Sequence, residues 1–193
     1  MKFTIVFMLL VLALTSCRSR QDAAITIDEN APATQSFFPV TNYIYGQIEE
    51  IKQAGINPIK IDSTQKNTDS TWLKVEELSS AFDAFLTPVI DSINLTKFFT
   101  ESSFDDKTIG AYTFTYTPLP NLPDSISLQR WDVYVNPVTN TVKRIFMVKK
   151  DTDNRELQLT WQSDQWCKIV TITANKDGQE SVSSVQTIKW NFD

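Results

Sequence analysis

From about Thr108 to the C-terminus, apolar and polar side chains alternate with a period of two, and this alternation constrains the fold most strongly. The segment 111–117 reads AYTFTYT and the segment 130–135 reads RWDVYV, so successive side chains point to opposite faces of a strand. Short polar segments with turn chemistry separate the alternating runs: 136–140, 151–154, 163–164 and 176–178. The pattern predicts an antiparallel meander of about five strands.

The preceding part of the chain has a different period. Apolar residues at steps of three and four predict an amphipathic helix over 40–54 and a second helix over roughly 75–87. A short strand at 59–62 and a polar loop at 63–70 are expected between them. The sequence therefore predicts an α+β domain, with N-terminal helices packed on one face of a curved antiparallel β-meander of about five strands.

The N-terminus has the pattern of an export signal. Residues 1–17 read MKFTIVFMLLVLALTSC, in which Lys2 precedes an apolar run of twelve residues. A helix of that length spans about 18 Å, too short for a hydrocarbon core of about 30 Å, so a secretory signal peptide is indicated. The final LTSC resembles the lipobox of bacterial lipoproteins. That resemblance implies cleavage after Ser16 and lipid attachment to the thiol of Cys17.

The chain is expected to have three parts. Residues 1–16 are a cleaved lipoprotein signal peptide, 17–36 are a lipidated flexible tether of small and polar residues, and 37–193 are a single α+β domain. The residue after Cys17 is Arg18, and the first acidic residue is Asp22. Acidic residues directly after the cysteine would favour retention at the inner membrane or export to the cell surface. We expect a lipid-anchored protein of the cell envelope, held at the outer membrane and facing the periplasm.

The composition excludes several kinds of chemistry. The chain has no histidine, which removes the usual triads, the Cys-His pair and imidazole metal ligands. A net charge of −5, from 18 basic and 23 acidic residues, argues against nucleic acid as a partner. With Cys17 lipidated, Cys167 is the remaining thiol, and it is interpreted as structural and inert because no histidine activates it. No catalytic residue, cofactor or metal site is predicted.

Five tryptophans are many for a domain of this size. Most are interpreted as core residues, but one or two at a rim of the sheet would stack on sugar rings or grip a partner's side chain. The candidate ligand contacts are Trp72, Trp131 and Trp166. A set of strand threonines is interpreted as the solvent side of the sheet: Thr113, Thr115, Thr117, Thr160, Thr171, Thr173 and Thr187.

Several segments together resemble small lipoproteins of Bacteroidota-type bacteria over roughly residues 40–193. They are STWL at 70–73, ESSF at 101–104, RWDVY at 130–134 and LQLTW at 157–161. The resemblance implies a lipoprotein but no particular activity. Four Asp-Ser segments match a short pattern that such bacteria O-glycosylate, although turn and cap chemistry explains them as well: 62–64, 69–71, 91–93 and 124–126.

With these exclusions, we interpret the chain as a non-enzymatic envelope domain, attached to the membrane by its N-terminal lipid. It is expected to bind a protein or envelope component through its sheet face or the Pro-rich segment 118–127. Two alternatives stay open. One is a saccharide-binding module that uses rim tryptophans, and the other is a hydrolase that uses carboxylates alone, such as Asp105 and Asp106.

Overall fold

A computed structural model of the chain describes residues 37–90, 95–152 and 154–192. The predicted signal peptide, the tether and the lipidation site Cys17 lie outside the described residues. Within these, one nine-stranded antiparallel sheet dominates, in the order β2-β1-β9-β8-β7-β6-β5-β4-β3. The strands are β1 Ile59–Thr64, β2 Thr68–Trp72, β3 Phe99–Asp106, β4 Ala111–Pro118, β5 Leu128–Val135, β6 Val142–Thr152, β7 Arg155–Gln162, β8 Trp166–Ala174 and β9 Glu180–Lys189.

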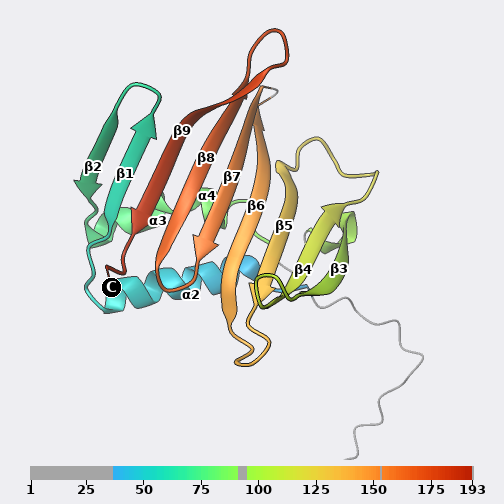
Figure 1. Ribbon diagram of the computed structural model, residues 1–193, viewed down its shortest axis with the longest axis horizontal. Coiled ribbons are helices and arrows are strands. Elements are labelled where there is room, and N and C mark those ends of the chain that lie inside the picture. Colours follow the sequence, from blue (N-terminus) through green and yellow to red (C-terminus); the bar gives the residue numbers. More distant parts are fainter. Residues whose placement is uncertain (1–36, 91–94, 153, 193) are drawn as a thin grey trace, which may run out of the picture. The chain divides into compact units, whose positions relative to one another are not determined.

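Seven of these strands, β3 to β9, follow one another as a meander, and the β1–β2 hairpin extends the sheet beyond β9 (Figure 1). The helical elements are α2 Val40–Gln53, a 3₁₀ turn Val75–Glu77, α3 Leu78–Ala81, α4 Asp83–Leu86 and a 3₁₀ turn Thr96–Phe98. Among the described residues, no helix is both long and apolar enough to cross a lipid bilayer.

The predicted α+β architecture with about five strands is wrong, because the protein is mainly a nine-stranded sheet with few helices. The sequence pattern missed two edge strands. The residues of β2 are all exposed, and most of β3 is too, so neither strand needs the alternation that reveals a half-buried strand. Part of β2 falls in the segment 63–70, which was predicted to be a loop.

The second predicted helix is also interrupted. The segment 75–87 forms a 3₁₀ turn and two four-residue helices, with Phe82 between the helices in a non-helical conformation. Two consecutive serines, Ser79 and Ser80, are weak helix formers and weaken the continuous helix that the apolar spacing predicts. The predicted apolar face is nevertheless correct, because Leu78, Phe82 and Phe85 are fully buried.

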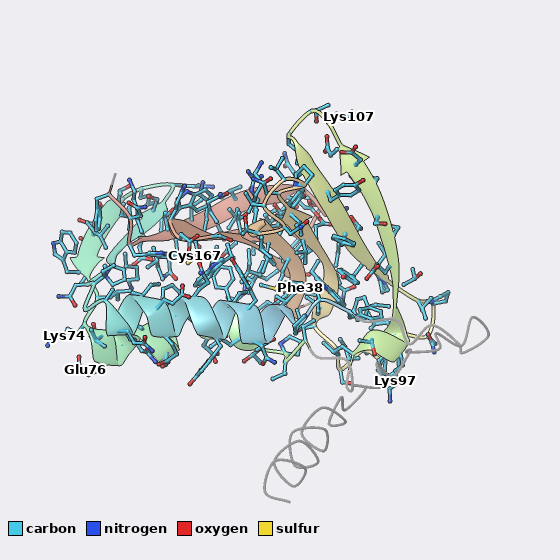
Figure 2. The ribbon with its side chains drawn as sticks, turned by 90° about the horizontal axis from the view of Figure 1, so that it is seen from below. Phe38, Lys74, Glu76, Lys97, Lys107 and Cys167 are labelled. Atoms are coloured by element: carbon cyan, nitrogen blue, oxygen red, sulfur yellow. The ribbon has the colours of Figure 1, made fainter. Side chains whose placement is uncertain are left out.

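The core lies between the helices and one face of the sheet, which we call the covered face. The helix predicted at 40–54 is confirmed as α2, and its buried stripe, which includes Ile44 and Ile48, belongs to the same cluster as Trp131 and Trp161. Figure 2 shows α2 running along this face and the tip of the β3–β4 hairpin, at Lys107, on the other side. The opposite side, the uncovered face, carries no helix of the described residues (Figure 2).

Candidate functional site

A row of directly paired residues crosses the uncovered face from one edge of the sheet to the other. Directly paired residues of antiparallel strands point to the same face, so the side chains of this row are neighbours. We call it the cross-strand row: Trp72, Ile59, Lys189, Trp166, Gln162, Arg144, Tyr134, Thr113 and Phe104, one residue from each strand in sheet order. At about 4.8 Å between strands, the row is roughly 38 Å long.

Large aromatic side chains are exposed along this row and beside it. Trp72 is 59% exposed and Phe104 is 52% exposed, at opposite edges of the sheet. Phe192, just beyond β9, is 54% exposed, and its ring centroid lies 5.8 Å from that of Trp72. Trp166 is partly exposed near the middle of the row. Single exposed apolar side chains are common on protein surfaces and need no explanation. Several exposed aromatic side chains that line up on one face are more typical of a binding site.

Three cations lie over aromatic rings of this face. The Lys168 ammonium is 5.2 Å from the ring centroid of Trp166, and the Lys189 ammonium is 6.0 Å from that of Phe192. The Arg144 guanidinium is 5.6 Å from the ring centroid of Tyr134, and its Nε donates to Gln162 Oε1 at 3.2 Å. Such contacts attract each cation to the electron-rich face of its ring and so keep positive charge beside the aromatic side chains.

The row becomes buried where it reaches β4 and β5. Although Asp132 and Thr113 belong to the uncovered face, they are only 1% and 2% exposed. Arg130 donates to Asp132 Oδ1 from Nε and Nη2, both at 3.2 Å, which compensates the buried carboxylate. Burial, followed by the negative charge of Asp132, raises the pKa of Tyr134 above its ordinary value. The stretch at β4 and β5 is therefore largely buried and charge-balanced, so it separates the exposed Phe104 at the edge from the continuous accessible part, which runs from β2 to β6.

The structure separates the three predicted tryptophan contacts. Trp72 and Trp166 lie in the cross-strand row, whereas Trp131 is fully buried on the covered face and therefore unavailable to a ligand. The threonine prediction is correct only in part, because Thr113 is buried and Thr173, like Thr171, points to the covered face. Thr115, Thr160 and Thr187 share one register line on the uncovered face, but Thr171 pairs with Leu157 on the other face.

Sequence reasoning missed the cations of the site. Lys168 follows Trp166 by two residues in a strand, so the alternation alone places both on one face. That local signal was available, because the intervening Cys167 is apolar and marks the buried face. Lys189 and Arg144 had no such signal, since only the register of the whole sheet brings them beside Trp166.

A second candidate is a cleft beneath the Pro-rich segment 118–127, with a volume of about 770 Å³. Among its described lining residues none is aromatic, and carboxylates and a lysine face it together. The lining includes Leu119, Leu122, Ile126, Asp124, Asp151 and Lys150. The uncovered face is therefore the better candidate site. It has exposed aromatic rings, and its Lys168 and Lys189 form no ion pair with a carboxylate of the described residues.

No family model, no curated protein and no solved structure matches this chain. The lipobox and the resemblance to Bacteroidota-type lipoproteins therefore stay predictions from the sequence.

The predicted inertness of Cys167 is consistent with its surroundings. It lies on the covered face, opposite to Trp166 as expected, and is 1% exposed. Burial raises the pKa of its thiol well above the ordinary value, so it holds its proton. Within the residues that the structure describes, no group of three or more carboxylates and thiols lies close enough to hold a metal ion.

The carboxylates suggested for a hydrolase do not converge. Asp105 pairs with Tyr112 and Asp106 pairs with Ala111, so these adjacent residues of β3 point to opposite faces of the sheet. A glycosidase needs two carboxyl groups on either side of one bond. This pair does not supply that arrangement, which argues against a hydrolase that uses these two residues.

Proposed function

We propose that this chain is a lipid-anchored, non-enzymatic domain of the cell envelope that binds a glycan on the uncovered face of its sheet. The lipid at Cys17 would hold the domain at the membrane, which we expect to be the outer membrane on its periplasmic side. Binding of an extended ligand needs no nucleophile or general base, in keeping with a chain that has no histidine.

The observation that supports this proposal most strongly is the alignment of Trp72 and Trp166 in one cross-strand row. A sugar ring presents a flat apolar face and polar edges, so it stacks on an aromatic side chain while its hydroxyls reach neighbouring polar groups. Gln162 and the threonines of the adjacent register line supply such polar groups, among them Thr160 and Thr187. A row that extends across several strands suits a linear chain better than a compact small molecule.

We expect that an envelope glycan which binds the full chain quenches its tryptophan fluorescence, and that W166A weakens binding about five- to tenfold. W72A should have a similar effect at the edge of the row. Fluorescence titration with soluble cell-wall and capsular glycan fragments, repeated by calorimetry, measures both.

The matched control is Y45A, because Tyr45 is an exposed aromatic residue on α2, at 54% exposure, and lies far from the row in the fold. Its affinity should equal that of the unmodified chain. If no glycan of a broad panel binds, or if Y45A and W166A weaken binding equally, the proposed function is wrong.

A further inference from the structure

Resting on the proposed function, we infer that the glycan is acidic, and that Lys168, Lys189 and Arg144 pair with the carboxylates of its uronic acid units. The glycan chain runs along the cross-strand row between β2 and β6, across the strands rather than along them. Its sugar faces stack on Trp72, Phe192 and Trp166, and its carboxylates meet the cations that lie beside and between these rings.

The distribution of charge carries this inference. The chain as a whole has a net charge of −5, yet the accessible part of the row carries Lys189 and Arg144, and Lys168 lies in the next register line of the same face. In the described part of the chain, neither Lys168 nor Lys189 forms an ion pair with a carboxylate. A protein that gathers cations on one face of an acidic body attracts anions to that face and repels them elsewhere.

The acidic residues of the same face lie away from these cations. Asp132 is paired with Arg130, and Asp106 lies near Tyr134, at the buried end of the row. Glu156 and Glu180 belong to the opposite ends of β7 and β9 from Gln162 and Lys189. Among the described residues, the row from Trp72 to Arg144 therefore holds cations and no carboxylate, which favours an anionic ligand.

The order of side chains along the row indicates a polysaccharide and not another polyanion. Trp72 with Phe192, then Lys189, then Trp166 with Lys168 follow one another across β2, β1, β9 and β8. Rings and charges thus alternate at intervals of one or two strands, about 5 to 10 Å. A polymer of acidic sugars presents both a stacking face and a charge in each unit, whereas inorganic polyphosphate presents charge alone.

The test is calorimetric titration of the full chain with polygalacturonate, with neutral dextran and with inorganic polyphosphate. We expect polygalacturonate to bind most tightly, and its affinity to fall steeply as salt is raised, since exposed charge pairs are screened. The double variant K168Q/K189Q should lose about three- to tenfold in affinity for polygalacturonate, as expected for two exposed ion pairs.

The matched control is K66Q/K176Q, which removes the same charge from exposed turns outside the row. Its affinity should stay within a factor of about two of the unmodified chain. If dextran binds as tightly as polygalacturonate and K168Q/K189Q changes nothing, the acidic ligand is excluded while the proposed glycan binding stands. If polyphosphate binds as well as polygalacturonate and W166A has no effect on either, the sugar itself is irrelevant and both proposals fail.

Discussion

The substitution W131A is expected to lower the free energy of unfolding by about 3–5 kcal/mol, the largest loss predicted for a single change in this domain. The Trp131 ring lies between two others: its centroid is 4.5 Å from that of Tyr116, in a stacked pair, and 4.6 Å from that of Phe99. Because the site is fully buried, truncation removes these contacts and leaves a cavity next to three strands. Urea unfolding followed by circular dichroism measures the loss.

The variant W131F separates packing from hydrogen bonding. Among the described residues the indole N–H of Trp131 has no partner, so phenylalanine removes an unsatisfied donor while keeping a ring in the stack. We expect a smaller loss, about 1–2 kcal/mol. W166A, on the uncovered face, should cost less than about 1 kcal/mol. If the unfolding curve of W131A coincides with that of the unmodified chain, Trp131 is not a core residue, and it is again a candidate ligand contact.

Trp131 and Trp166 show which structural features the sequence predicts without the structure. In RWDVYV, Trp131 alternates in phase with Val133, and the charged residues fall on the other face, so burial follows from local pattern. Trp166 is followed by Cys167, Lys168 and Ile169, so the apolar pair 167 and 169 marks the buried face and assigns Trp166 to the other. Alternation with a period of two is therefore enough to predict both orientations.

The alternation does not predict the register between strands that are far apart in the sequence. Trp72 and Trp166 are almost a hundred positions apart in the chain, and they share a row because β1 pairs with both β2 and β9. That pairing depends on a polar edge hairpin that buries little, and such strands carry a weak local signal. The helix α2, in contrast, is predictable because its apolar stripe repeats over four turns and is buried throughout.

The other informative residue that sequence patterns overlook is a buried lysine. Lys149 lies on the covered face of β6 and is 4% exposed, and its ammonium donates hydrogen bonds to the carbonyl oxygens of Ala84 and Thr87. These carbonyls lie at the end of α4, where the backbone lacks helical partners. Burial lowers the pKa of Lys149 to about 8, and the nearby charge of Asp83 opposes this shift in part.

This pKa predicts that the domain becomes more stable as the pH rises above 8. The unfolded chain, with an ordinary lysine pKa of 10.5, binds more protons than the folded chain between these two values. The free energy of unfolding should therefore rise by about 2 kcal/mol from about pH 7.5 to about pH 9.5, as the penalty of burying a charged ammonium is relieved.

The variant K149M should lack this rise, because methionine fills similar space and does not titrate. Burial raises the pKa of Tyr43, Tyr116 and Tyr134, which destabilises the fold only as the pH approaches 10 and beyond, and both proteins retain these residues. Subtracting the two pH profiles of urea unfolding isolates the contribution of Lys149. K150M is the matched control, since Lys150 is the next residue in β6 and is exposed. Parallel profiles for K149M and the unmodified chain over this range would mean that the buried ammonium keeps its charge at an ordinary pKa, with the two carbonyls compensating its burial completely.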